Sequence, residues 1–233
     1  MLAETAWGLY PPCTQRKQFG PIPAAPAKVT SAGISDYPIQ MKWSRIAERI
    51  LGMLGWKVDH RLPPVDKLVV IGAPHTSNWD LPLGLLGMWA LDHNFYWVAK
   101  HTIFIGPAGW LFRKLGGIPV DRRVHTGFIN RAAESIKSRT RIALVIAPEG
   151  TRSKTEYWKK GFYHIAMEAG VPIGLGYIDC ATRTLGVGAT LWPTGDMEKD
   201  FEFIKAFYAD KKGFRPHLQG KVRIRPERDG QSA

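Results

Sequence analysis

Between residues 65 and 225, short apolar runs alternate along the chain with longer stretches in which the apolar positions follow a helical period. Short apolar runs bounded by turn residues predict strands that are buried in a sheet. We expect strands at residues 68–72, 95–99, 118–120, 142–147, 171–177, 182–190 and 221–225. We expect helices at about residues 81–91, 109–115, 126–138, 162–169 and 197–208.

Alternating strands and helices are typical of α/β proteins, in which helices cover both faces of a largely parallel sheet. We therefore predict one α/β domain over residues 65–233, with a mostly parallel sheet flanked by helices. In such sheets, ligands bind beyond the C-terminal ends of the strands. The loops after Gly72 and Ala147 both begin at that edge, so we expect their side chains to lie close together.

The chain before residue 65 has two parts with different patterns. Residues 41–64 begin with an amphipathic helix, in which Ile46, Ile50 and Leu54 share one face, and continue as a linker. This helix would either pack on the core or lie on a membrane with its basic residues at lipid phosphates. Residues 1–40 hold six of the 17 prolines and no apolar period, which predicts either disorder or an artefactual extension, with Met41 as the true start.

The net charge of +12 favours anionic partners, such as nucleic acid, phosphorylated small molecules or anionic lipid. On charge alone a nucleic-acid binder stays possible, but the basic residues do not form one stripe, and we expect no nucleic-acid partner. Cys13 and Cys180 offer neither a disulfide framework nor a zinc spacing, which favours a reducing compartment. No apolar run reaches the roughly 20 residues of a spanning helix, and the N-terminus lacks a signal pattern. We expect a soluble or membrane-surface protein.

The first polar segment that could carry chemistry runs from Pro74 to Asp80, between a predicted strand and a predicted helix. If His75 lies in the loop and Asp80 in the first helical turn, the carboxylate can hold one imidazole nitrogen and leave the other free to take a proton. Ser77 suits the N-cap of that helix. This stretch alone is equally compatible with a simple helix cap and an unrelated loop histidine.

The second polar segment follows the apolar run that ends at Ala147 and consists of Glu149, Gly150, Thr151, Arg152 and Ser153. The glycine lets the backbone approach a ligand closely. Arg152 presents a planar fork suited to phosphate, and the two hydroxyls can donate beside it. An ordinary charged loop would have the same composition, but its expected place beside His75 favours a binding role.

A third segment, from Gly116 to Arg123, is a predicted strand that ends in Asp-Arg-Arg, where guanidinium groups could meet an anion. Alone this segment is weak evidence, because a basic loop end is usually solvated. Motifs of three other enzyme classes are absent from the sequence: Gly-x-Ser-x-Gly, Gly-x-Gly-x-x-Gly after the first strand, and a phosphate loop with Gly-Lys-Ser/Thr.

In order and spacing these segments resemble the glycerophospholipid acyltransferase family, which includes the lysophosphatidic acid acyltransferases. The His-x4-Asp motif of that family matches His75 and Asp80, and its Glu-Gly-Thr-Arg-Ser motif matches residues 149–153 letter for letter. Its Gly-x-Ile-Phe-Ile-Asp-Arg-like motif matches residues 116–122, and its Val-Pro-Ile motif matches residues 171–173. The resemblance covers roughly residues 66–180, and the sequence departs from the family pattern at Pro74, Pro119 and Leu175.

The resemblance implies an acyltransferase domain that moves a fatty acyl group from an acyl thioester, acyl-CoA or acyl carrier protein, to a hydroxyl of a lysophospholipid. The default acceptor would be 1-acylglycerol 3-phosphate. His75 would be the general base, and Asp80 would orient it and balance its charge. Arg122 and Arg152 would bind the acceptor phosphate. The substrate-binding residues implied are Arg122, Glu149, Gly150, Thr151, Arg152 and Ser153, and no bound cofactor or metal is required.

The resemblance also implies a peripheral protein at the cytoplasmic side of the cell membrane, in contact with an anionic lipid surface. The short stretch from Trp110 to Lys114 could be an interfacial anchor. Two alternatives stay open: another acceptor, such as glycerol phosphate or a different lysolipid, and a catalytically silent lipid-binding protein. The sequence leaves the oligomeric state open.

Overall fold

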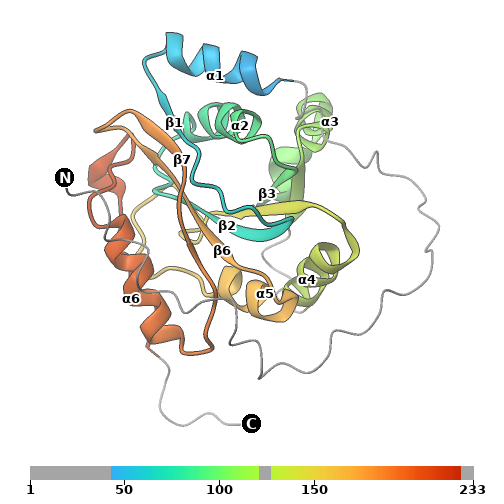
Figure 1. Ribbon diagram of the computed structural model, residues 1–233, viewed down its shortest axis with the longest axis vertical. Coiled ribbons are helices and arrows are strands. Elements are labelled where there is room, and N and C mark those ends of the chain that lie inside the picture. The colour runs from blue at the N-terminus through green and yellow to red at the C-terminus, as the bar shows by residue number, and fades with distance from the viewer. Residues whose placement is uncertain (1–42, 121–126, 227–233) are drawn as a thin grey trace. The chain divides into compact units, whose positions relative to one another are not determined.

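The computed structural model describes residues 43–120 and 127–226, and in these residues seven strands join into one sheet (Figure 1). In chain order the strands are β1 (Lys57–Asp59), β2 (Lys67–Ala73), β3 (Phe95–Lys100), β4 (Gly117–Val120), β5 (Ile142–Ile146), β6 (Ile173–Asp179) and β7 (Thr184–Leu191). Across the sheet their order is β1-β7-β6-β2-β5-β3-β4. Among the described strands, only β6 and β7 pair antiparallel, so the predicted α/β domain with a mostly parallel sheet is confirmed.

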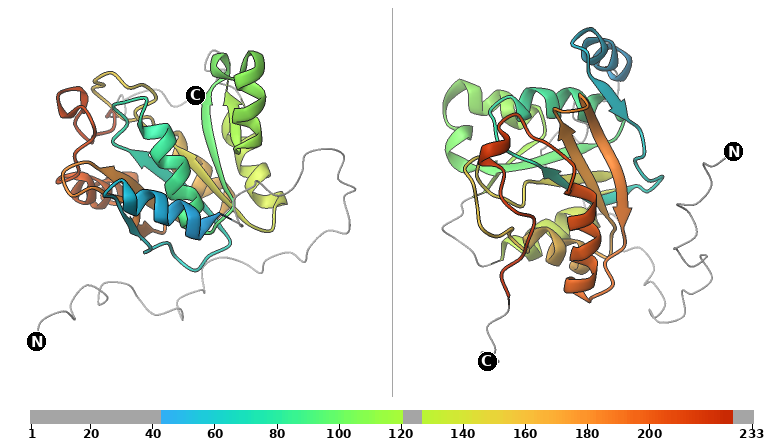
Figure 2. Two further views of the ribbon diagram at one scale, coloured as in Figure 1. Left: turned by 90° about the horizontal axis from the view of Figure 1, so that it is seen from above. Right: turned by 90° about the vertical axis from the view of Figure 1, so that its left-hand side faces the viewer.

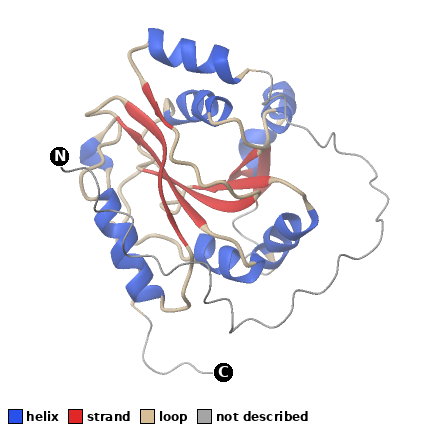
Figure 3. Ribbon diagram, in the orientation of Figure 1, coloured by secondary structure: helices blue, strands red, loops and turns tan. Residues whose placement is uncertain are grey.

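Helices cover both faces of this sheet, as the pattern predicts (Figure 3). They are α1 (Ser44–Met53), α2 (Asp80–Ala90), α3 (Gly106–Lys114), α4 (Phe128–Ser138), α5 (Gly161–Ala169) and α6 (Met197–Tyr208), with short 3₁₀ turns η2 (His101–Phe104) and η3 (Pro216–Leu218). One face packs against α1, α2 and α3, and the other against α4, α5 and α6 (Figures 1 and 2). None of the helices in these described ranges combines the length and the apolar character needed to cross a bilayer.

The central strand β2 shows why the two layers form. Its side chains alternate between the faces, as a period of two requires. Val69 and Ile71 enter the core under α4, α5 and α6, whereas Leu68 and Val70 enter the core under α2. Because both faces are buried, β2 is an unbroken apolar run in the sequence.

The predicted helix at the start of residues 41–64 is present as α1, and one side of it packs on the core. Ala47 and Leu51 are buried against α2, while Ile46 and Leu54 are exposed. Residues 1–42 lie outside the described residues, and so do the predictions for residues 1–40 and for Met41.

Two strand predictions need correction. Residues 221–225 do not form a strand. Their only ladder contact with the part of the chain that the structure describes is an isolated bridge between Trp158 and Ile224. The sequence pattern also missed β1, which pairs parallel with β7 at one edge of the sheet. Only Val58 in β1 is apolar, so no apolar run marks this strand.

Candidate active site

His75 and Asp80 meet in the turn that joins β2 to α2. Strand β2 ends at Ala73 and α2 begins at Asp80, which places the loop at the C-terminal edge of the sheet. His75 Nδ1 lies 2.9 Å from Asp80 Oδ2. The side chain of Asp80 is 7% exposed and that of His75 is 31% exposed, so the carboxylate is covered while the imidazole reaches solvent. The structure therefore brings together the two residues whose spacing suggested a dyad.

The carboxylate of Asp80 is fixed by its own loop. Its Oδ2 also accepts hydrogen bonds from the backbone N–H of Thr76 at 2.8 Å and of Ser77 at 2.9 Å. These donors and the start of α2 favour negative charge at this position. The expected capping by Ser77 is wrong in its details: α2 is preceded by Trp79, and the Ser77 hydroxyl accepts from the Trp79 N–H at 3.2 Å. The loop turns before the helix begins, which the spacing of polar residues alone does not reveal.

The 2.9 Å contact between His75 Nδ1 and Asp80 Oδ2 favours one tautomer of His75. Because an ionised carboxylate has no proton of its own, the imidazole nitrogen that faces it is assigned as the protonated Nδ1. The Nε2 atom then carries a lone pair and can take a proton from a bound hydroxyl. This arrangement would suit a general base whose orientation and developing charge are supported by a buried acid.

Glu149 joins the second polar loop to the first. It follows β5, which lies parallel beside β2, and its Oε2 accepts a hydrogen bond of 3.0 Å from the backbone N–H of His75. Glu149 is only 6% exposed. Burial raises the pKa of its carboxyl to about 7, the nearby charge of Asp80 adds to that rise, and the His75 hydrogen bond opposes it. The expectation that the two loops lie together at one edge is confirmed.

The remainder of the second loop faces solvent. Gly150 has φ of 67°, and a Cβ there would lie 3.0 Å from Lys159 Cε, so both its conformation and its close neighbour favour glycine. Thr151 and Ser153 are exposed, and the Ser153 N–H donates to the Thr151 hydroxyl at 3.2 Å. Arg152 is exposed and has no hydrogen bond or ion pair with the residues that the structure describes. Its guanidinium is therefore available to an anion.

Arg122, the other predicted phosphate ligand, lies outside the described residues. The strand before it, β4, runs parallel to β3 and ends at Val120, so the chain leaves the sheet at the same edge as β2 and β5. Within residues 43–120 and 127–226, no three His, Cys, Asp or Glu side chains gather closely enough to hold a metal ion.

Sequence reasoning missed one contributor to this edge, residues Lys211–Gln219, which we call the 211–219 segment. It follows α6 and lies against the His75 loop, where the Arg215 N–H donates to Thr76 Oγ1 at 3.1 Å. Its Gly and Pro residues indicate a loop, but no local pattern could place that loop beside a histidine so far away in the chain.

Comparison with known proteins adds to this geometry. The chain matches the model of the acyltransferase family over residues 57–174, which include both polar loops. A protein of Cocos nucifera named 1-acyl-sn-glycerol-3-phosphate acyltransferase is 37% identical over 108 residues, which are 42% of this chain and 33% of that protein. A Haemophilus influenzae protein of the same name is 28% identical over 158 residues, 64% of each. The chain thus spans less than two thirds of the length of either relative.

A solved structure shares the fold. The crystal structure of the 1-acyl-sn-glycerophosphate (LPA) acyltransferase PlsC from Thermotoga maritima matches with a TM-score of 0.53 and 23% sequence identity. The match covers 72% of this chain and 76% of the other.

Proposed function

This chain belongs to the acyltransferase family, and we propose that it moves a fatty acyl group from an acyl thioester to a hydroxyl of a lysophospholipid. The acceptor that we favour is 1-acylglycerol 3-phosphate, because two relatives carry the name of that activity. The observation that carries the proposal is the 2.9 Å contact between His75 Nδ1 and Asp80 Oδ2, which leaves Nε2 available as a base.

The chemistry follows from this contact. His75 Nε2 takes the proton of the acceptor hydroxyl while that oxygen attacks the thioester carbonyl. When the tetrahedral intermediate collapses, the C–S bond breaks, and the imidazolium returns the proton to the departing thiolate. The bond formed between the acceptor oxygen and the acyl carbon remains in the new ester. Asp80 stabilises the imidazolium between the two steps, and no covalent acyl-enzyme is needed.

We assign the loop of residues 149–153 and Arg122 to the acceptor phosphate. The guanidinium of Arg152, which has no partner among the described residues, and the exposed hydroxyls of Thr151 and Ser153 support this assignment. For Glu149, the bond to the His75 N–H supports a role in holding the two loops together, rather than contact with an acceptor hydroxyl. The acyl donor would be acyl-CoA or acyl carrier protein, both of which suit the charge of +12.

We further propose that the protein acts at the cytoplasmic surface of the cell membrane. Large apolar side chains are exposed on and beside α1 and α3, which cover the same face of the sheet: Trp43, Ile46, Met53, Leu54, Ile105, Trp110 and Leu111. Lys114 Nζ lies 5.8 Å from the centre of the Trp110 ring, which pairs an aromatic side chain with a basic one. Such pairs suit the interface of an anionic bilayer.

The test is release of free thiol from an acyl-CoA in the presence of a lysophospholipid panel. We expect turnover by the wild type and a loss of at least about 10³-fold in kcat for His75→Ala, since the base is removed. His164→Ala is the matched control, because His164 is an exposed histidine on α5. Equal turnover by wild type and His75→Ala would refute the dyad. Lipid binding without turnover on any acceptor would identify a silent lipid-binding protein instead.

A further inference from the structure

The 211–219 segment forms part of the wall around the His75 loop. The hydroxyl that accepts the Arg215 N–H belongs to Thr76, which is the neighbour of His75 and is 1% exposed. At Gly213 the packing is so close that a Cβ would lie 2.6 Å from Thr76 Oγ1. The backbone of Arg215 is thus hydrogen-bonded to Thr76, the residue that follows the proposed general base His75.

Other hydrogen bonds hold the segment in this position. Asp179, at the end of β6, accepts from the Lys212 N–H at 3.0 Å. The side chain of Gln219 links both ends of the segment, because its Oε1 accepts from the Gly213 N–H at 3.3 Å and its Nε2 donates to the Lys211 carbonyl at 2.9 Å. The segment is therefore anchored to the C-terminal edge of the sheet.

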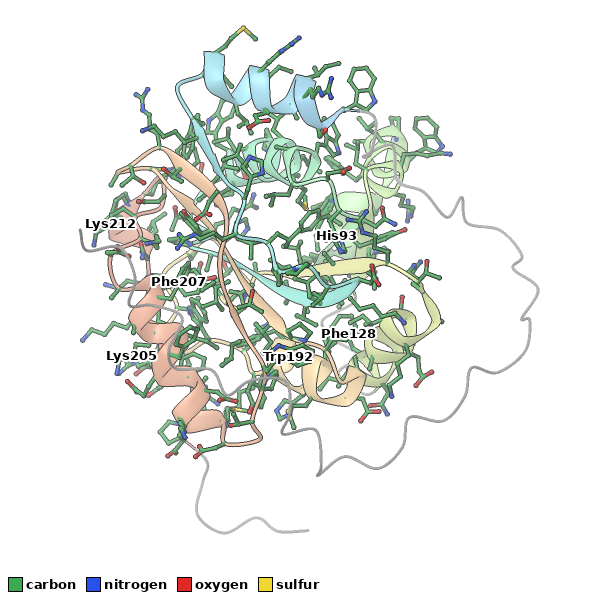
Figure 4. The ribbon with its side chains drawn as sticks, viewed as in Figure 1. His93, Phe128, Trp192, Lys205, Phe207 and Lys212 are labelled. Carbon is green, nitrogen blue, oxygen red and sulfur yellow. The ribbon has the colours of Figure 1, made fainter. Side chains whose placement is uncertain are left out.

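This anchored segment carries two exposed cations, Lys212 and Arg215. The side chains of Lys212 and Arg215 are exposed and make no hydrogen bond or ion pair within residues 43–120 and 127–226. Lys211 differs, because its Nζ binds Asp210 at 2.7 Å. In Figure 4 the labelled Lys212 lies beyond the end of α6. The backbone of Arg215 is anchored to the His75 loop, and a guanidinium with no neutralising partner among the described residues favours an anionic ligand.

We propose that Arg215, with Lys212 beside it, binds a phosphate group of a substrate, in addition to the arginine of the 149–153 loop. The inference rests on the proposed acyl transfer, in which both substrates carry phosphate: a phosphomonoester on the acceptor and the phosphates of coenzyme A on the donor. The segment lies after residue 174, where the match to the family ends, so that match assigns it no role.

The experiment measures binding without turnover. Isothermal titration would compare coenzyme A and a short-chain 1-acylglycerol 3-phosphate with their phosphate-free analogues, pantetheine and 1-acylglycerol. We expect Arg215→Ala to weaken binding of one phosphate ligand about tenfold and to leave its analogue unchanged. Arg215→Lys should lose less. The ligand that loses affinity identifies the source of the phosphate.

Lys199→Ala is the control. Lys199 is an exposed cation in the first turn of α6, which follows β7 at the other edge of the sheet, where Leu191 pairs with Ile173. The inference is overturned if Arg215→Ala binds both phosphate ligands as tightly as the wild type, or if it weakens the phosphate-free analogues equally. Thiol release by the wild type is measured in parallel. Absent turnover with an Arg215-dependent affinity for phosphate would refute acyl transfer and keep the phosphate site.

Discussion

Asp80→Asn would separate the charge of Asp80 from its role in orienting His75. The Oδ2 position receives the N–H groups of Thr76 and Ser77 as well as His75 Nδ1, so all three contacts are with donors. A carboxamide must therefore place its oxygen there, because its NH₂ group would face two backbone donors. The tautomer and orientation of His75 are then kept, and the negative charge is lost.

The expected magnitude follows from the ion pair that forms during reaction. An imidazolium and a carboxylate about 4 Å apart attract each other by about 4 kcal/mol at an effective dielectric constant of about 20. The partial exposure of His75 makes this an upper value. Loss of 4 kcal/mol of transition-state stabilisation lowers kcat by about 10³-fold. We therefore expect Asp80→Asn to lower kcat by about 10²- to 10³-fold, with little change in KM.

Thiol release at saturating donor and acceptor is the assay. Asp66→Asn is the control, because Asp66 is an exposed acid just before β2, at the opposite edge of the sheet. A double variant completes the cycle: if Asp80 acts only through His75, adding Asp80→Asn to His75→Ala should cost nothing more. The reasoning fails if Asp80→Asn keeps more than about a tenth of the wild-type kcat. It also fails if the kcat of the double variant falls by the product of the two single-variant losses.

Two further predictions concern pH and the membrane. A carboxyl whose pKa is raised by folding stabilises the protein below its unfolded pKa, and this contribution is lost as pH rises to about 7. The free energy of unfolding of Glu149→Gln, relative to that of the wild type, should therefore rise between pH 5 and pH 8 by up to about 3 kcal/mol. Urea unfolding across this range measures it, and unfolding free energies that change in parallel with pH for the two proteins would contradict the prediction. Trp110→Ala should weaken binding to anionic vesicles about tenfold, whereas Trp192→Ala, a comparably exposed control near α5 (Figure 4), should not. Equal losses of vesicle binding by the two variants in cosedimentation would refute a specific role for α3.

The sequence predicted those parts of the fold whose order is local. Strand β2 is marked by an apolar run and helix α6 by a helical period, each within consecutive residues, and the observed bounds of α6 agree with the prediction. The contact between Glu149 and His75 was also within reach, because parallel neighbouring strands end at one edge. The contact between His75 and Asp80 could be predicted once the helix was expected to begin near Asp80, with His75 in the preceding loop.

What the sequence missed depends on contacts between distant parts of the chain. Strand β1 is recognisable only from its pairing with β7, since two of its three residues are charged. The bond between Arg215 and Thr76 joins residues 139 positions apart, and no periodic signal reports such a contact. The apolar residues Val222 and Ile224 alternate like those of a strand, yet they pack as partly buried residues against the core without a continuous partner strand.

The position of β1 in the sheet shows that the residues that match the family model are fewer than the residues that must fold together. The stretch that identifies the family begins at Lys57, the first residue of β1, and ends at residue 174, inside β6. In the described sheet, β1 has a single neighbour, β7, which comes from the later part of the chain. A fragment excised at the limits of the family match would therefore leave its own first strand without backbone partners and would lose the cover of α6. The stretch that matches the family model is thus shorter than the stretch that must be present for the sheet to form.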